Sequence, residues 1–309
     1  KIFTLVTVLA IYWAATFIAM KGIGWVGKIS KWGGLIGTII PAGLLIVLGI
    51  IYIATGGHNY MDMSQSFIPD LTKFDNLVLA SSIFLFYAGM EMMGVHVMDV
   101  NNPSRNYPKA IIIGSLATVC IFVLGTFALG VIIPAKDINL TQSLLIGFDN
   151  FFRYFHIPWA GPVIAVALML GVLASVLTWV AGPSKGIFTV GKAGYLPPFF
   201  QKSNSHGVQR NILLVQGGIV TLLSLLFVVM PSVQSFYQIL SQLTILLYLI
   251  MYMLMFAAAI TLRYKMKTAQ RPFRLGKGNA LMWVLGVTGF CGSLLAFVLS
   301  FIPPGQINT

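Results

Sequence analysis

The sequence LVLASSIFLFYAGMEMMGVHVMDVNNPSRNYP, residues 77–108, contains an apolar run that is interrupted by Gly89 and then by Glu91. A carboxylate at the centre of a bilayer costs about 2.5–3.5 kcal/mol on insertion scales, so such residues usually face a helix bundle or a wet cavity. Gly89 weakens a helix by about 1 kcal/mol relative to Ala. Broken helices are tolerated at membrane depth where the freed backbone groups face protein or water, and many transporters bind substrate there. The stretch therefore predicts a broken membrane span that carries a functional carboxylate.

Two roles remain open for this carboxylate. In the first, Glu91 binds substrate or a proton, because burial in a low-dielectric span disfavours its charged form. In the second, Glu91 is hydrogen-bonded inside a packed bundle, and Gly89 lets a neighbouring helix approach closely. The first role is favoured, and it makes Glu91 the predicted proton-coupling or pH-sensing residue.

The composition is that of an integral membrane protein. Of the 309 residues, 58% are hydrophobic and 8% are charged, whereas soluble domains carry about 25% charged residues. The net charge of +12 is compatible with a nucleic-acid partner, but the basic residues lie between apolar spans rather than in one patch. We therefore predict a lipid bilayer and no nucleic acid among its partners. Because the chain begins at Lys1 without a charged leader, we expect it to be a piece of a longer protein.

Long apolar stretches predict an all-α fold with about eight transmembrane helices. Each stretch is close to the roughly 20 helical residues that cross a bilayer core of about 30 Å. Between the fifth and sixth, a short amphipathic interfacial helix is expected within residues 185–200. The eight stretches are residues 2–20, 33–54, 77–98, 110–133, 160–182, 211–230, 235–262 and 280–302.

The second of these stretches has two further features. Pro41 predicts a kink, because proline cannot donate the helical hydrogen bond. Gly33, Gly34 and Gly37 are expected on one helical face, where small residues let two helices pack closely.

The basic residues predict the orientation of the chain in the membrane. Loops 21–32, 99–109, 183–210 and 263–279 are predicted to be cytoplasmic, because cytoplasmic loops are rich in Lys and Arg. These loops hold 15 of the 19 basic residues: Lys21, Lys28, Lys31, Arg105, Lys109, Lys185, Lys192, Lys202, Arg210, Arg263, Lys265, Lys267, Arg271, Arg274 and Lys277.

Signatures of catalysis and of metal binding are missing from the sequence. The four His residues are scattered at positions 58, 96, 156 and 206, and no P-loop or metal-ligand cluster occurs. Glu91 has no nucleophile or base beside it in the sequence, so we predict neither an enzyme nor a cofactor. Cys120 and Cys291 fall inside predicted spans without disulfide or metal spacing, and are expected to be small apolar core residues.

Several motifs, in this order and spacing, resemble the amino acid, polyamine and organocation (APC) transporters, and more narrowly the bacterial glutamate/gamma-aminobutyrate antiporters. The resemblance extends over essentially the whole chain. The wider resemblance rests on FYAGME (86–91) and DVNNPSRNYPKA (99–110), and the narrower one on IIP (132–134), DINL (137–140), GVLA (171–174) and TWVAGPSKG (178–186).

The resemblance implies an incomplete APC fold, whose complete form has twelve helices, ten of them in two inverted five-helix repeats (the LeuT-like 5+5 arrangement). The chain would lack the first three helices and the last. It would then be one transmembrane transporter domain, residues 1–309, in which residues 1–56 end the first repeat, 77–263 form the second and 280–302 are an additional C-terminal helix.

Site residues are carried over from the family position by position. The resemblance implies that residues 87–90 are the unwound middle of the family's sixth helix, and that Glu91 matches an acidic residue tied to acid-dependent transport. Trp179 matches an aromatic residue near the pathway, and Tyr248 and Tyr252 match two tyrosines that line it. The implied substrate-binding set is Tyr87, Ala88, Gly89, Met90, Glu91, Ser175, Trp179, Tyr248 and Tyr252.

One position departs from the antiporter pattern. An acidic residue is expected where the chain has Ser175. Because serine neither titrates nor repels a carboxylate, the departure leaves the substrate and the pH dependence open.

The expected function is secondary transport of amino acids by alternating access, as a glutamate/gamma-aminobutyrate-like antiporter in the bacterial inner membrane, with a role in acid resistance. The alternatives are exchange of another amino acid for its amine product, and an amino acid permease of the same superfamily. A channel or a structural membrane subunit ranks below both.

Overall fold

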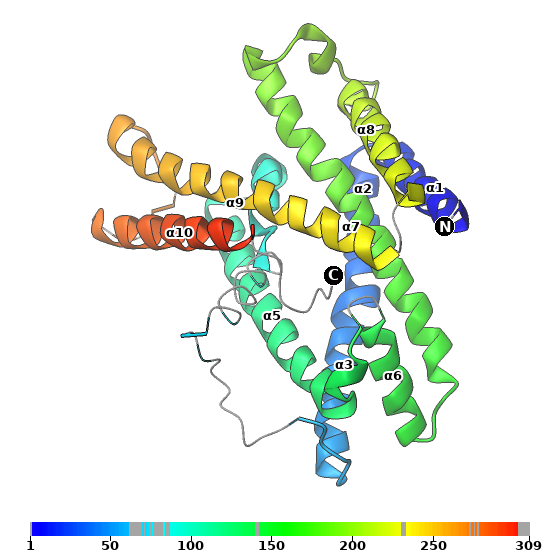
Figure 1. The fold of residues 1–309 in the computed structure, drawn as a ribbon. Helices are drawn as coiled ribbons and strands as arrows, with labels where there is room; N and C mark the ends of the chain where they lie inside the picture. The colour runs from blue at the N-terminus through cyan, green and yellow to red at the C-terminus, as the bar shows by residue number, and fades with distance from the viewer. Residues whose placement is uncertain are drawn as a thin grey trace. The chain divides into compact units, whose positions relative to one another are not determined.

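The computed structural model describes residues 2–61, 70, 72–73, 76, 83, 87–139, 142–229, 233–271, 273–274, 276 and 278–301. Within these residues all regular secondary structure is helical, as expected (Figure 1). They divide into two compact units. Unit 1 comprises Lys1–Ser64, Met92–His96 and Leu116–Val233, and unit 2 comprises Gln65–Glu91, Val97–Ser115 and Gln234–Thr309.

Six helical stretches of the described chain are long and apolar enough to cross a membrane. A seventh, α8 (Arg210–Val229), has a shorter apolar part, and nine of the 22 residues of the expected span at 77–98 lie outside the described residues. The described residues thus contain six candidate membrane spans, fewer than the eight predicted. The six are Ile2–Ala19 (α1), Ile23–Ala54 (α2, η1 and α3), Pro103–Ile132 (α5), Ala160–Tyr195 (α7 and η5), Ile239–Lys265 (within α9) and Ala280–Leu299 (α10).

The expected loop at 21–32 is mostly helix. It contains α2 (Ile23–Gly34), which continues through η1 (Leu35–Ile39) into α3 (Ile40–Ala54). The lysines in this segment favoured a loop, but α2 is amphipathic: Val26 is buried, while Lys28 is exposed. A helix with one polar face accommodates such lysines without burying their charges.

A π-helical turn precedes Pro41. The backbone N–H of Ile40 donates to the carbonyl of Leu35, five residues earlier. Pro41 has no N–H to give the carbonyl of Gly37, and its ring would clash with that carbonyl in a regular α-helix. The wider π turn relieves this conflict at the position where a kink was expected.

The prediction of a short interfacial helix within residues 185–200 is wrong. The helix α7 (Ala160–Val190) instead runs through Pro183 and ends in the π-helical turn η5 (Gly191–Tyr195), which is followed by the short 3-10 helix η6 (Pro198–Gln201). Ser184 is fully buried, and its hydroxyl donates to the carbonyls of Val180 and Ala181. This burial and these bonds keep the chain helical past the proline.

Unit 1 packs around α7, the long helix labelled in Figure 1. One core, between α1, α2, α7 and α8, contains Leu177 and Leu213. The other is built on α6 (Ser143–Tyr154), a helix that the sequence reasoning missed, whose Phe148, Phe151 and Phe152 are almost fully buried. Spacing of 3–4 residues puts these three rings on one helical face.

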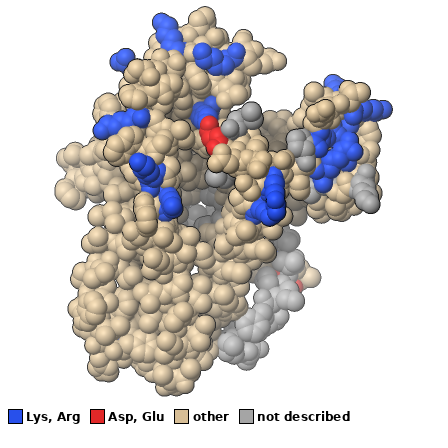
Figure 2. Space-filling model, turned by 180° about the vertical axis from the view of Figure 1, so that it is seen from behind, with Lys and Arg blue, Asp and Glu red and all other residues tan. Residues whose placement is uncertain are grey.

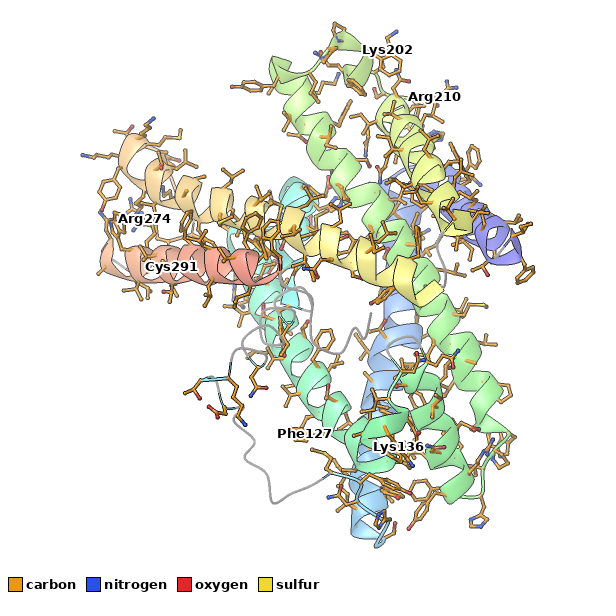
Figure 3. The ribbon with its side chains drawn as sticks, viewed as in Figure 1. Phe127, Lys136, Lys202, Arg210, Arg274 and Cys291 are labelled. Atoms are coloured by element: carbon orange, nitrogen blue, oxygen red, sulfur yellow. The ribbon has the colours of Figure 1, made fainter. Side chains whose placement is uncertain are left out.

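Most of the basic residues of unit 1 lie in the connections at one end. Asn204, in the connection from α7 to α8, donates to the carbonyl of Met20 in the connection from α1 to α2, with 2.7 Å between Nδ2 and O. Figure 3 shows Lys202 and Arg210 at this end and Lys136 at the opposite end of the unit. This arrangement agrees with the predicted segregation of charge; which end is cytoplasmic stays a prediction.

Unit 2 contains the helix pair α9 (Val233–Lys265) and α10 (Ala280–Leu299) together with the first part of α5. Ile245 and Leu249 of α9 are buried with Ala296 of α10. The two helices share this small core.

Large apolar side chains remain exposed along the helices of both units. Examples are Val172, Leu222, Leu254 and Val284, each more than 60% exposed. Such faces are expected to contact lipid, which is as apolar as these side chains. Cys120 and Cys291 are exposed as well, so the prediction that they are core residues is wrong.

Candidate functional site

The backbone breaks from α-helical geometry at Gly89. This residue has φ 109° and ψ −8°, a left-handed conformation that glycine adopts without the steric penalty of a Cβ atom. It is followed by a 3-10 helix, η3 (Met90–Asp99), whose ten residues exceed the three or four that such helices usually have. The turn lies within the segment expected to be unwound.

A closed hydrogen-bond network holds the carboxylate beside this break. The Tyr252 hydroxyl of α9 donates to Glu91 Oε2, with 2.7 Å between the oxygens. The N–H of Gly89 is shared between Glu91 Oε2 and Tyr252 Oη, at 3.1 Å from each. Hydrogen bonds to an ionised carboxylate are about twice as strong as bonds between neutral groups. The network therefore joins the break in the chain to α9.

The second carboxylate oxygen, Oε1 of Glu91, is also buried. It accepts no hydrogen bond from the residues that the structure describes. A buried polar atom without a partner costs free energy, so a hydrogen-bond donor such as an ammonium group that reaches this oxygen would be stabilised.

Tyr248 lies one helical turn from Tyr252. The two ring centroids are 5.9 Å apart, and Phe256 continues the same face of α9. Tyr248 and Tyr252 thus line one face of the helix that reaches Glu91, as their spacing of four predicted. Met90, next to Glu91, places its sulfur 3.8 Å from where a Cβ atom of Gly114 would lie.

Two other predicted site residues belong to unit 1. Ser175 and Trp179 line a cavity of about 380 Å³ between α1, α7 and α8. Their partners in its wall include Tyr12 and Gln216, which the sequence reasoning missed. The Tyr12 hydroxyl is buried in this wall and interacts with the side chain of Gln216. Both are polar groups inside apolar spans, a signal that would have identified them.

The predicted set therefore separates into two groups. Tyr87, Ala88, Gly89, Met90, Glu91, Tyr248 and Tyr252 lie in unit 2, whereas Ser175 and Trp179 lie in unit 1.

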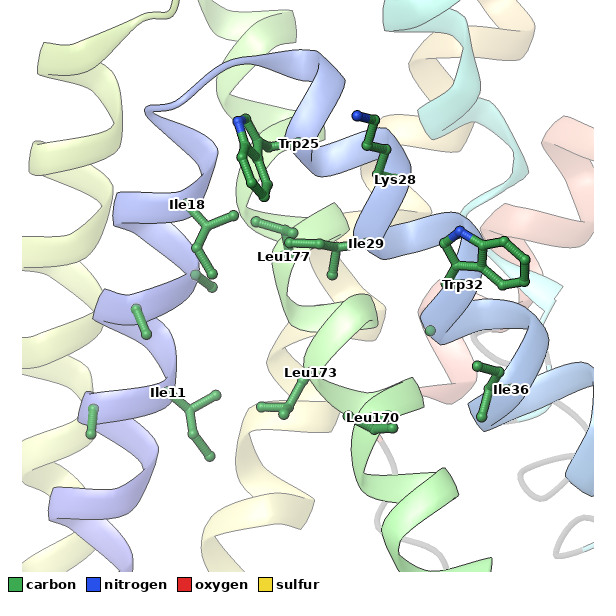
Figure 4. Close-up of a pocket in the computed structure, with 14 residues that line it drawn as sticks. Ile11, Ile18, Trp25, Lys28, Ile29, Trp32, Ile36, Leu170, Leu173 and Leu177 are labelled. Carbon is green, nitrogen blue, oxygen red and sulfur yellow. The ribbon is translucent and has the colours of Figure 1, made fainter.

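Unit 1 also has a larger cavity, of about 690 Å³, between α1, α2 and α7. Figure 4 shows Trp25, Lys28 and Trp32 along α2 and Leu170, Leu173 and Leu177 along α7. Lys28 is the only charged side chain in this lining. A zwitterionic substrate would leave its polar groups without partners here, so the cavity is a weaker candidate than the Glu91 network.

No three His, Cys, Asp or Glu side chains are placed to hold a metal ion within the described ranges. The chemistry that the Glu91 network offers is hydrogen bonding and proton exchange at a carboxylate.

A protein-family model for amino acid permeases matches residues 1–309, the whole chain. The chain belongs to the amino acid permease family. The match confirms the predicted resemblance to APC transporters. Together with the six apolar helices, it also confirms the prediction of a multi-pass membrane protein from a family of transporters.

The chain is also similar to individual transporters. An uncharacterised transporter of Legionella pneumophila is 34% identical over 307 residues, which is 99% of this chain and 66% of the relative. A glutamate/gamma-aminobutyrate antiporter of Lactococcus lactis is 32% identical over 304 residues, 97% of this chain and 60% of the relative. A probable agmatine/putrescine antiporter of the same species is 24% identical over 272 residues, 86% of this chain and 58% of the relative. The chain thus spans less than two thirds of the length of each.

Proposed function

We propose that the chain carries the transport machinery of a secondary antiporter of the bacterial inner membrane, which exchanges glutamate for gamma-aminobutyrate or a similar pair by alternating access. The observation that carries this proposal is the carboxylate of Glu91, held beside the Gly89 break with one oxygen bonded and the other without a partner in the described chain. The similarity to the Lactococcus lactis antiporter supports the choice of substrates.

We infer different tasks for the two oxygens of Glu91. Oε2 is held by Tyr252 and by the N–H of Gly89, which fixes the orientation of the carboxylate. Oε1 is then the oxygen that binds a proton or the ammonium group of the substrate. Protonation removes the charge that strengthens the bond from Tyr252, so proton or substrate binding changes how firmly the break is tied to α9.

A second candidate is exchange of another amino acid for its amine, or of one amine for another. Ser175 favours it, because α7 offers no carboxylate at this position to titrate with external acid or to repel a carboxylate substrate. The similarity to a probable agmatine/putrescine antiporter also supports it. Both candidates share recognition of an ammonium group.

Exchange in proteoliposomes tests the role of Glu91. The full-length protein is reconstituted, loaded with gamma-aminobutyrate, agmatine or putrescine, and assayed for uptake of labelled glutamate or amine between pH 4.5 and 7.5. We expect Glu91→Gln to lower exchange by about ten-fold or more, the equivalent of one charged hydrogen bond of about 1.5–3 kcal/mol, and to flatten the pH profile.

Asp149→Asn is the matched control, since Asp149 forms an exposed ion pair with Arg153 at 2.8 Å. It should leave the pH profile unchanged. An unaltered profile in Glu91→Gln, with normal expression, would make this carboxylate structural and reject the proposal.

Ser175→Glu separates the two candidates. If Ser175 lines the pathway, a titrating group on α7 should sharpen the acid dependence and shift the preference between glutamate and amine. Unchanged preference and pH response would remove Ser175 from the pathway, and the argument for amine exchange with it.

A further inference from the structure

Four basic side chains surround a concave site where α9 ends and α10 begins. Arg263, Lys267, Arg271 and Arg274 line a cavity of about 270 Å³ together with Tyr264 and Asn279. Figure 3 labels Arg274 at this end of the helix pair, and Figure 2 shows Lys and Arg side chains gathered there. We call these four residues the basic site.

Two of the arginines are held in position by hydrogen bonds to backbone carbonyls and to the side chain of Asn279. Arg263 donates through Nε to Oδ1 of Asn279 and through Nη2 to the carbonyl of Gly278, both at 3.0 Å. Arg271 donates to the carbonyls of Leu262 and Met266, at 2.9 and 3.0 Å. A guanidinium has five N–H donors, so each arginine keeps donors for a ligand. The loss of side-chain entropy on binding is thereby reduced.

Within the described residues the site has no acidic counterion. Residues 150–309 contain no Asp or Glu. In the part of the chain that the structure describes, none of the four side chains forms an ion pair. Four cations around one cavity repel one another, so an anion that enters it is stabilised.

Aromatic residues place the basic site at the level of lipid headgroups. Trp283 donates from Nε1 to the hydroxyl of Tyr264 at 2.6 Å, where the apolar spans Ile239–Lys265 and Ala280–Leu299 meet their polar connection. Trp and Tyr concentrate at the boundary between hydrocarbon and water. A phosphate at this depth is one that belongs to a lipid.

We propose that the basic site binds the phosphate headgroup of an anionic phospholipid. Planar guanidinium groups match phosphate oxygens in paired hydrogen bonds, and Lys267 adds a point charge. Clusters of basic residues beside a membrane span attract anionic lipids at about 1 kcal/mol per residue. Basic residues that only set orientation would need neither a cavity nor arginines fixed by hydrogen bonds. The proposal is independent of the transported substrate.

Spin-labelled lipids test the proposal directly. The purified protein is placed in phosphatidylcholine bilayers with trace spin-labelled phosphatidylglycerol or phosphatidylcholine. Electron paramagnetic resonance then gives the association constant of the anionic label relative to the neutral one. The test variant is Lys267→Gln with Arg274→Gln, because neither side chain makes a hydrogen bond to another described residue, unlike Arg263 and Arg271. The matched control, Lys192→Gln with Lys202→Gln, removes the same charge from the basic end of unit 1.

We expect the test pair to lower the relative association constant by about five-fold for each charge removed at the site, and the control pair to leave it nearly unchanged. The charge-conserving pair Lys267→Arg with Arg274→Lys should retain most of the selectivity, which separates lost binding from lost folding. Equal losses in the test and control pairs would overturn the site in favour of a general surface charge. Displacement of the anionic label by millimolar inorganic phosphate, at constant ionic strength, would overturn the assignment to lipid.

Discussion

In unit 1 two helices touch backbone to backbone at Gly37 and Gly171, whereas in unit 2 Gly89 is distinguished by a left-handed backbone. A Cβ atom on Gly37 would lie 2.2 Å from the nitrogen of Gly171, and one on Gly171 would lie 2.5 Å from the carbonyl oxygen of Gly37. The conformation of Gly89, with φ 109°, is one that L side chains rarely adopt. Glycine thus allows close contact between two helices in unit 1, whereas in unit 2 it allows a left-handed backbone conformation.

This difference separates what each glycine contributes. The contact between Gly37 and Gly171 holds η1 against α7 and supports the rigid part of unit 1. The turn at Gly89 instead directs its N–H toward Glu91 and Tyr252, which belong to the candidate site. We therefore expect changes at the first place to act on folding and changes at the second to act on exchange.

Gly37→Ala should have the largest effect on stability. The added methyl group meets the backbone of α7, which cannot rotate away, so the cost should reach about 3 kcal/mol, the upper part of the range for overpacking. The measurement is the apparent melting temperature in detergent. Gly43→Ala is the control in the adjoining helix, since nothing lies within 4 Å of its added atom; alanine there should be neutral or slightly stabilising. Similar melting temperatures for the two variants would contradict the close crossing.

Tyr252→Phe should affect exchange more than stability. It removes the donor to Glu91 Oε2 and an acceptor for the N–H of Gly89, at a cost of about 2 kcal/mol. We expect exchange in proteoliposomes to fall about ten-fold, with a smaller loss of melting temperature than in Gly37→Ala. Tyr237→Phe, on an exposed position of the same helix, is the control. Wild-type exchange in Tyr252→Phe would mean that the network does not take part in transport.

Gly89→Ala should have the smallest effect on stability. Alanine in a left-handed conformation costs about 1–2 kcal/mol of strain and leaves the packing of unit 1 unchanged. Exchange should fall several-fold, because relief of the strain moves the N–H away from Glu91. Uptake rates and melting temperatures are measured on the same preparations. A loss of stability as large as that of Gly37→Ala, with exchange intact among the folded molecules, would remove the distinction between the two glycines.

The sequence alone identified most of the apolar helices, because a membrane span is a local property of some 20 successive residues. It also singled out Gly33 and Gly37 as contact residues. Both glycines lie against α7, but Gly34, expected on the same face, meets nothing within 4 Å. Gly89 and Glu91 were recognisable because a carboxylate and a glycine are unusual inside an apolar run.

Only the tertiary structure decided which distant residues meet. Tyr252 reaches Glu91 across 161 positions, and Gln209 donates to Ser184 across 25. It also showed that α7 continues through Pro183, since buried contacts outweighed the preference of proline to end a helix. The basic site also depends on tertiary structure. Its charges are visible in the sequence, but its cavity forms only where α9 and α10 meet. Composition acts locally along the chain, whereas hydrogen bonds and cavities form between segments that only folding brings together.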